Sequence, residues 1–299
     1  MHTESIGNMT IDRAGEIDRY LFKAQDFLRG LDQPMLQRYK PVLGPRLIDP
    51  STGDLIISFH SYVIRAPNLT VLVDTCNGND KDRPGKPWQN MHTNSYYLDN
   101  LARLGVRPED VDIVLCTHLH GDHVGWNTRL SEGRWLPTFP KAKYLMTRRD
   151  YEHFSKLTEG PANAPGPYPA FADSVLPVVE AGRAELVEMD KSVHRHLDDS
   201  IWLEPAPGHT PGHITVHAKG RGGSAVLCGD VIHHPIQFHE PQLSNNGDVD
   251  AAQALASRNR MLQDCADNHS VLLTGHFPAP TSGYVTAEGE RFRFRYKDD

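Results

Sequence analysis

Thr117-His118-Leu119-His120-Gly121-Asp122-His123 places three imidazoles and one carboxylate in a single short stretch. The apolar run Val111–Cys116 comes directly before it and predicts a buried strand. A strand end holds side chains in fixed directions, and divalent ions require nitrogen and oxygen donors that are held in this way. The stretch therefore predicts a metal site at the end of a strand.

The spacing within this stretch predicts donors for more than one ion. In an extended chain His118 and His120 project to the same side. Gly121 permits the tight turn that directs Asp122 and His123 to a second position. One loop could therefore serve two ions.

The complete pattern His-x-His-x-Asp-His is more specific than any of its parts. A lone His-x-His in a chain with 17 histidines is usually a solvated or core pair. The full pattern arises by accident only about one time in a few hundred. It resembles the motif of the metallo-β-lactamase superfamily of metal-dependent hydrolases, and this resemblance implies three more ligands downstream in a fixed order.

Composition limits the classes of partner. With 299 residues the chain could form one large domain or two small ones. Its net charge of −7 argues against nucleic acid and anionic membranes as partners, which leaves a small molecule as the expected substrate.

The cysteines and the hydropathy predict the compartment. Cys76, Cys116, Cys228 and Cys265 are widely spaced, and we interpret them as reduced buried thiols. We find no signal peptide at the N-terminus and no run near the roughly 18 apolar residues of a membrane span. The expected location is cytoplasmic.

The first 50 residues are expected to form a helical extension. Residues 11–30 carry an apolar stripe at helical spacing that Gly30 closes, and four prolines between Pro34 and Pro50 are expected to break any further helix. The helix could pack on the core, or act as a lid or as the arm of a homodimer.

Strands are expected next at Leu55–Phe59, Ser61–Ile64 and Thr70–Val73. Asp74 follows the last of them, and a carboxylate at that place is costly unless a hydrogen bond or a cation stabilises it. The resemblance assigns Asp74 a supporting role beneath the metal loop, although Cys76 departs from the usual Val-Asp-Thr-Gly segment.

Two loops are candidates for the wall of a substrate pocket. The segment 77–93 is rich in Gly and Pro and contains Trp88, which could line a pocket or pack under its own loop. The irregular segment Thr158–Ala172 is interpreted as a pocket rim, with a linker as the alternative. Helices are expected after Ser95 and from Arg148, with a strand at Lys143–Met146 between them.

Three downstream elements supply the remaining donors. Gly208-His209-Thr210-Pro211-Gly212-His213 matches the third motif of the superfamily, in which the first histidine is the ligand and the second its neighbour. Asp230 ends an apolar strand and has two oxygens with which to bridge two ions. His276 follows the strand-like run Val271–Thr274.

The resemblance covers residues 55–280 and implies an α/β fold, the four-layer αββα sandwich. We expect one hydrolase domain over residues 51–299 that ends in a hairpin or edge strand at Gly283–Tyr296. His118, His120 and His209 would hold one ion, and Asp122, His123 and His276 the other, with Asp230 between them. Zinc is the expected metal, with manganese, cobalt and iron as alternatives.

The expected reaction is hydrolysis. A hydroxide that bridges the two ions would attack a lactone or ester carbonyl, and Asp122 would carry the proton to the leaving group. Trp88, Trp126 and Phe238 suggest an apolar or aromatic acyl group.

Within the superfamily the residues favour lactonases and organophosphate hydrolases. Asp230 argues against true β-lactamases, and the 23 residues after His276 are too few for the helical domain of glyoxalase II. The homoserine lactone lactonases carry a tyrosine three residues after the bridging aspartate, where this chain has His233, which could bind substrate or fill the wall. Phosphotriester hydrolysis is the alternative. An iron redox enzyme of the same fold usually has Glu in place of His120.

Overall fold

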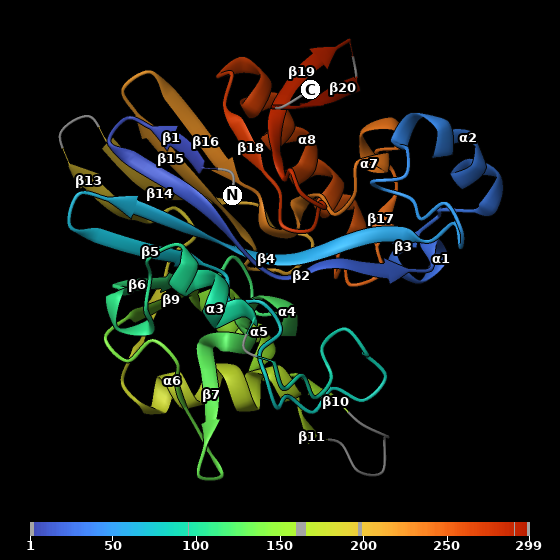
Figure 1. Cartoon of the computed structure of the whole chain (residues 1–299). Coiled ribbons are helices and arrows are strands. Elements are labelled where there is room, and N and C mark those ends of the chain that lie inside the picture. Colours follow the sequence, from blue (N-terminus) through green and yellow to red (C-terminus); the bar gives the residue numbers. More distant parts are fainter. Residues whose placement is uncertain (1–2, 95, 160–165, 197–198, 290, 298–299) are drawn as a thin grey trace. The chain divides into compact units, whose positions relative to one another are not determined.

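The computed structural model describes residues 3–94, 96–159, 166–196, 199–289 and 291–297. The chain divides into two compact units. Unit 1 comprises Met1–Glu16 and Phe59–Met189, and unit 2 comprises Ile17–Ser58 and Asp190–Asp299. Each contains a seven-stranded sheet as its largest sheet (Figure 1).

The sheet of unit 1 has the order β1-β2-β4-β5-β6-β9-β12, and its strands β2 and β4 continue across the division into unit 2. The pairs β1–β2 and β4–β5 are antiparallel, whereas β5, β6, β9 and β12 run parallel. Parallel strands place their carboxyl ends at one edge, which is where loops carry functional groups in α/β folds. The strands are β1 (Thr3–Ile6), β2 (Met9–Phe22), β4 (Leu55–Ala66), β5 (Leu69–Val73), β6 (Ile113–Leu115), β9 (Lys143–Thr147) and β12 (Ala184–Val187).

The helices of unit 1 share one hydrophobic core with this sheet. Leu101 of α3, Phe154 of α5 and Val178 of α6 are buried in the same cluster as Val114 of β6 and Tyr144 of β9. The helical elements are α3 (Tyr96–Arg103), η1 (Pro108–Asp110), α4 (Gly121–Val124), η2 (Gly125–Asn127), α5 (Arg148–Phe154), η3 (Phe171–Val175) and α6 (Leu176–Glu180). Two small hairpins complete the unit, β7 (Thr128–Ser131) with β8 (Arg134–Pro137) and β10 (Thr158–Glu159) with β11 (Gly166–Pro167).

The sheet of unit 2 has the order β13-β14-β15-β16-β18-β19-β20. Only the pair β16–β18 is parallel among the paired strands described. The strands are β13 (Ser192–His196), β14 (Asp199–Pro205), β15 (Ile214–Gly220), β16 (Gly223–Leu227), β18 (Val271–Leu273), β19 (Ser282–Glu288) and β20 (Arg291–Tyr296).

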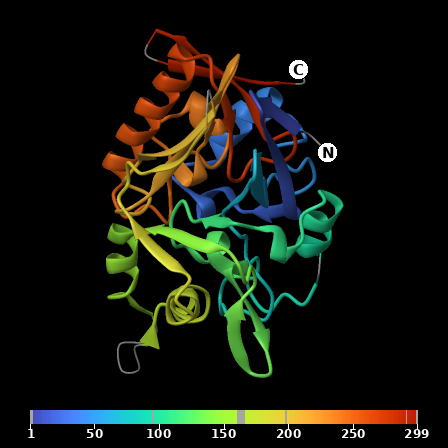
Figure 2. The same ribbon diagram turned by 90° about the vertical axis from the view of Figure 1, so that its left-hand side faces the viewer.

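The long helix α8 (Ala251–Asp267) packs against this second sheet (Figure 2). Its residues Met261 and Cys265 are buried in one cluster with Val226 of β16 and Leu272 of β18. Shorter elements connect the strands, namely α1 (Ala24–Phe27), β3 (Leu28–Arg29), α2 (Gln33–Leu43), η4 (Gly229–Val231), α7 (Ile236–His239) and β17 (Ser244–Asn245), with β3 paired to β17.

The helix predicted over residues 11–30 is wrong for most of its length. Residues 9–22 form β2, and only Ala24–Phe27 are α-helical. The apolar pair Met9 and Ile11 has the period of a strand, and Gly7, with φ 61°, makes the turn that pairs β1 with β2. Sheet pairing supplied by the fold outweighs the helical stripe, which tertiary contacts commonly override.

The expectation that prolines would prevent any further helix is also wrong, since α2 spans Gln33–Leu43. Pro34 lies in the first turn, where its missing N–H is not needed by the helix. The Asp32 side chain accepts a hydrogen bond of 2.8 Å from the backbone N–H of Met35 and caps that turn. Pro41 lies inside the helix, close to its last residue, Leu43.

Most other predicted elements are confirmed. The two strands expected between residues 55 and 64 form the single strand β4, and the hairpin expected at Gly283–Tyr296 is β19–β20. All four cysteines are free and buried. Among the described residues, no helix combines the length and hydropathy that a membrane crossing requires.

Candidate metal centre

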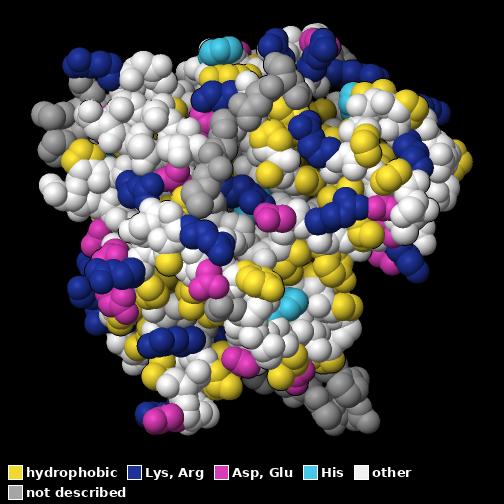
Figure 3. All heavy atoms as spheres, in the orientation of Figure 1, with side chains coloured by type: hydrophobic (Ala, Val, Ile, Leu, Met, Phe, Trp, Pro, Cys, Tyr) yellow, Lys and Arg dark blue, Asp and Glu magenta, His cyan; other side chains and the backbone are white. Residues whose placement is uncertain are grey.

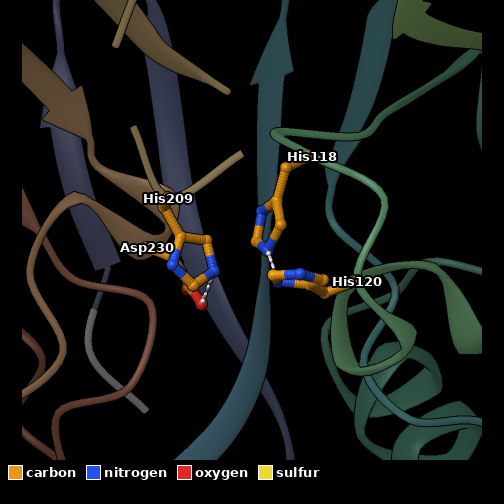
Figure 4. A group of neighbouring side chains, drawn as sticks. All are labelled: His118, His120, His209 and Asp230. Carbon is orange, nitrogen blue, oxygen red and sulfur yellow. Dashed lines mark hydrogen bonds and ion pairs between the residues drawn. The ribbon is translucent and has the colours of Figure 1, made fainter. Parts of the chain in front are cut away.

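Unit 1 presents its donors in the loop that follows β6. His118 and His123 are buried, and His120 and Asp122 are partly exposed. Nε2 of His118 lies 3.1 Å from Nδ1 of His120, so these two side chains do face the same point, as Figure 4 shows. His123 lies within the short helix α4, and its Nε2 lies 3.9 Å from Oδ2 of Asp122.

Asp74 stabilises this loop through hydrogen bonds to Thr117 and His123. Its carboxylate accepts hydrogen bonds of 2.8 Å from the backbone N–H and from the hydroxyl of Thr117, and its Oδ2 lies 2.8 Å from Nδ1 of His123. Asp74 occupies the left-handed region with φ 60°, directly after β5. The supporting contacts predicted for Asp74 are therefore present.

These contacts indicate which ring nitrogen of His118 and of His123 can serve as a metal ligand. A carboxylate only accepts, so Nδ1 of His123 carries the proton and Nε2 keeps its lone pair. The hydroxyl of Thr117 already donates to Asp74, so it accepts at 3.1 Å from Nδ1 of His118. His118 and His123 consequently both present Nε2 as a ligand atom, which is how outer hydrogen bonds prepare histidines for metals.

Unit 2 gathers its donors around the carboxylate of Asp230. Oδ2 lies 3.1 Å from Nε2 of both His209 and His233, and Oδ1 lies 3.1 Å from Nε2 of His276. Figure 4 shows the contact of His209 with Asp230. The backbone N–H of Asp230 donates to Nε2 of His213 at 3.0 Å. The ring of His213 also lies edge-on to that of His209, with centroids 5.9 Å apart, so His213 is the neighbour of His209 that was predicted.

The outer nitrogens in unit 2 are fixed as well. Nδ1 of His209 lies 2.7 Å from Oδ1 of Asp248, and Nδ1 of His276 donates to the backbone carbonyl of Ser58 at 3.0 Å. Asp248 in turn accepts from the hydroxyl of Ser244 at 2.7 Å and from the backbone N–H of Asn245 at 2.8 Å. His209 and His276 thus also present Nε2.

The charges in unit 2 suit a cation. Burial opposes the charged form of His209, but Asp230 and Asp248 outweigh burial and raise its pKa to about 9. Burial would raise the pKa of Asp248, but His209 outweighs it and lowers the pKa to about 2. Burial is the main cause that lowers the pKa of His233. Two buried carboxylates therefore favour positive charge between them, and a divalent ion would supply it.

Sequence reasoning missed several supporting residues. Asp248 lies in a polar turn, far along the chain from His209, with no apolar strand before it to mark it. Glu16 is buried in unit 1, where its carboxylate accepts from Asn77, Gly78 and the indole N–H of Trp126. The expected helix concealed Glu16, because a helix would have placed it on the polar face.

The loop 77–93 is fixed to the rest of unit 1 by buried charges. Arg83 makes two hydrogen bonds of 2.7 Å with the carboxylate of Asp173. Nζ of Lys81 lies 2.7 Å from the hydroxyl of Thr128. Gln89 then donates from Nε2 to Oδ1 of Asp122 at 3.1 Å, so this loop reaches a predicted catalytic residue.

The residues predicted to line a substrate pocket lie in different surroundings. Residues 160–165 of the rim lie outside the described residues, but Tyr168 contacts Phe154, which in turn contacts the ring of His120. Trp126 belongs to the core, where it stacks on Tyr97. Trp88 is partly exposed.

The sequence and the fold both resemble known proteins. The profile of the metallo-beta-lactamase superfamily matches residues 60–276. Metallo-beta-lactamase domain-containing protein 1 of Xenopus laevis is 40% identical over 234 residues, which cover 76% of this chain and 74% of that protein. The N-acyl homoserine lactonase AiiB of Agrobacterium fabrum is 32% identical over 95 residues, 29% of this chain and 32% of the relative.

Two solved structures cover almost the whole chain. The hydrolase AbOPH of the beta lactamase superfamily superposes with a TM-score of 0.77 at 22% identity over 99% of this chain and 96% of its own. AidC, a dizinc quorum-quenching lactonase, superposes with a TM-score of 0.76 at 17% identity over 99% and 97%. These likenesses confirm the predicted α/β fold, the αββα sandwich.

Proposed function

This chain belongs to the metallo-beta-lactamase superfamily, and from that premise we propose that it is a metal-dependent hydrolase that opens a lactone or cleaves an ester at a centre of two divalent ions. One ion would be held by His118, His120 and His209, the other by Asp122, His123 and His276, with Asp230 shared. Zinc is the proposed metal, supported by the donor set and by the dizinc lactonase of the same fold.

The observation that carries this proposal is the hydrogen bonding of the outer imidazole nitrogens. Nδ1 is engaged in His118, His123, His209 and His276, and each ring is left with Nε2 as its ligand atom. A packing role would not require Nδ1 to be the nitrogen held by an outer partner in all four histidines.

The chain's own residues would divide the work of hydrolysis. When bound, the ions would polarise the carbonyl oxygen and lower the pKa of water toward neutrality. Asp122, oriented by Gln89, would take the proton of the attacking water and return it to the leaving oxygen. His233 lies beside Asp230 and would donate a hydrogen bond to the substrate.

A lactone or ester is the proposed substrate class because several relatives of this chain are named as lactonases. Bacillus cereus N-acyl homoserine lactonase is 23% identical over 176 residues, and AiiB supplies a second example. His233 stands where the lactonase tyrosine is expected, so we propose a lactone or ester other than the homoserine lactones. We also propose that the protein is cytoplasmic and acts on a small molecule, without nucleic acid or membrane as partner. The homodimer stays a prediction, and the N-terminal helix that suggested it is largely a strand.

The test combines elemental analysis with a panel of a γ-lactone, an aryl ester, a phosphotriester and a β-lactam. We expect two zinc equivalents and lactone or ester turnover that a chelator removes and zinc restores. His209→Ala should lose both, whereas His217→Gln, which changes another buried histidine, should keep them. If only the phosphotriester is hydrolysed, the substrate is a phosphotriester and not a lactone or ester. If protein with its full metal content hydrolyses nothing in the panel, the proposal that it is a hydrolase is wrong.

A further inference from the structure

A cavity lies entirely within unit 2, and the proposed function does not use it. It is lined by residues of α2, α7 and β20 and has a volume of about 490 Å³. Cavities that bind small molecules measure roughly 300–1,000 Å³. β20 is the last strand of its sheet, so one of its sides is left open to other elements. The cavity thus has the size of a ligand site.

The floor of the cavity is aromatic and aliphatic. Phe238 of α7 stacks on Phe294 of β20 with ring centroids 5.2 Å apart and planes 15° apart. Tyr296 lies next to Phe294, with centroids 4.9 Å apart. Val42, at the end of α2, is 66% exposed and adds an aliphatic surface to the lining of the cavity. These surfaces would favour an apolar chain or ring.

The rim of the same cavity is cationic. It contains Arg46, Arg291 and Arg293, with Glu288 as the acid among the lining residues. Glu288 lies 3.6 Å from Arg293 and partly neutralises it. Figure 3 shows Lys and Arg side chains among hydrophobic ones over the part of unit 2 where Figure 1 places α2 and α7. The guanidinium groups of this rim would attract an anion.

The cationic group of Arg46 is held in place by the floor. Its Cζ lies 3.8 Å from the centroid of the Tyr296 ring, a cation–π contact that keeps the guanidinium beside the apolar surface. A planar guanidinium offers paired donors that match a carboxylate. An anionic head and an apolar tail would therefore meet complementary groups within one cavity.

The walls of the cavity are fixed to one another before any ligand binds. Tyr39 of α2 stacks on His239 of α7, with centroids 5.0 Å apart, and its hydroxyl donates to Glu240 at 2.6 Å. Behind α7, Nε2 of His234 lies 3.1 Å from the carbonyl of Leu47. Preformed walls reduce the entropy that binding would cost.

We propose that this cavity binds a carboxylate that carries an apolar chain or ring, with the carboxylate at Arg46 and Arg291 and the apolar part over Phe238 and Phe294. The proposal concerns a site separate from the donors around Asp230 and does not depend on the hydrolase activity.

The experiment is calorimetric titration of the full chain with decanoate, compared with decanol, which lacks the charge, and butyrate, which lacks the tail. Each titration is run with metal-loaded protein and again after chelation, because a carboxylate could also bind a metal centre. We expect decanoate to bind with the same affinity in both forms, and decanol and butyrate to bind at least about tenfold more weakly.

Variants locate the site. The double variant Arg46→Gln/Arg291→Gln should weaken decanoate by about tenfold or more. Arg295→Gln is the matched control, because Arg295 lies on the same strand but does not line this cavity, and it should bind as the wild type does. Val42→Asp adds a negative charge at the apolar side and should weaken binding as well.

Three results would overturn the proposal. The first is equal binding of decanoate by wild type and the double variant. The second is an equal loss in Arg295→Gln, which would indicate a general charge effect. The third is the absence of any decanoate binding that survives chelation. Circular dichroism of each variant separates loss of the site from loss of the fold.

Discussion

The two units support their histidines in different ways. In unit 1 the donors come from one short loop, and Asp74, at the end of the neighbouring strand, holds both that loop and His123. In unit 2 the donors His209, Asp230 and His276 come from three separate segments. Their outer partners come from two more, with Asp248 in a loop and the carbonyl of Ser58 in β4. The donors of unit 1 are therefore brought together by one short stretch of sequence, whereas the donors of unit 2 come together only when distant segments fold.

Each unit also contains a buried arginine, and the two arginines have different kinds of hydrogen-bond partner. In unit 1, Arg83 binds the carboxylate of Asp173 with two hydrogen bonds. In unit 2, Arg258 of α8 is buried and donates to backbone carbonyls, at 2.9 Å to Val231 and 2.8 Å to Pro241. Val231 follows Asp230 directly, so Arg258 fixes the backbone on which the shared donor stands.

The largest effect should come from Asp230→Asn, which removes the charge that unit 2 gathers its histidines around. We expect turnover to fall by roughly 10³-fold or more, together with loss of bound metal. The matched change Asp267→Asn, at the exposed end of α8, should alter neither quantity. Retention of two metal equivalents by Asp230→Asn would show that the halves do not share this ligand.

Arg258→Met should destabilise the fold by about 2–4 kcal/mol, because several buried carbonyls would lose their donor. Chemical denaturation measures this change, and Arg258→Lys should recover part of it. An unchanged free energy of unfolding would mean that unit 2 does not depend on this side chain, and the contrast between the units would weaken.

Asp74→Asn and Asp248→Asn test the two outer carboxylates against each other. Each should lower metal affinity by roughly 10- to 100-fold, since the histidine it orients would lose its fixed direction. Stepwise zinc titration should show the loss at different steps, because Asp74 supports His123 and Asp248 supports His209. Loss at the same step in both variants would contradict the proposed division of ligands.

The last prediction concerns pH and Lys81 in unit 1. Burial lowers the pKa of Lys81 to about 7 from its ordinary 10.5. Between these values the unfolded chain binds more protons than the folded one, so this group makes stability rise with pH across that window. The cost of burying the charge is present in full below pH 7.

Comparison of wild type with Lys81→Met isolates this contribution. The free energy of unfolding of the wild type, relative to the variant, should increase from pH 7 to about pH 10. A difference that is constant with pH would show that Lys81 is charged to the same extent in both states.

The sequence alone predicted several features that depend on neighbouring residues and missed several that depend on residues far apart in the chain. Asp74 could be assigned a supporting role because it ends an apolar strand, where a carboxylate needs a partner. Asp248 has no such signal, because its partner His209 lies in a distant segment. The N-terminal strand β2 was missed because its pairing in the sheet is a distant contact, while its local stripe favours a helix. The role of each proposed metal ligand stays a prediction until metal is measured.

The path of the chain has a consequence for inheritance. The chain passes from one unit to the other after residues 16, 58 and 189, and β2 and β4 are continuous through the first two of these points. A fragment ending at Met189 would carry Ser58 without His276, and β3 without its partner β17. Each unit is made of two separate stretches of the chain, so a single crossover within the gene cannot exchange one unit intact without disturbing the other.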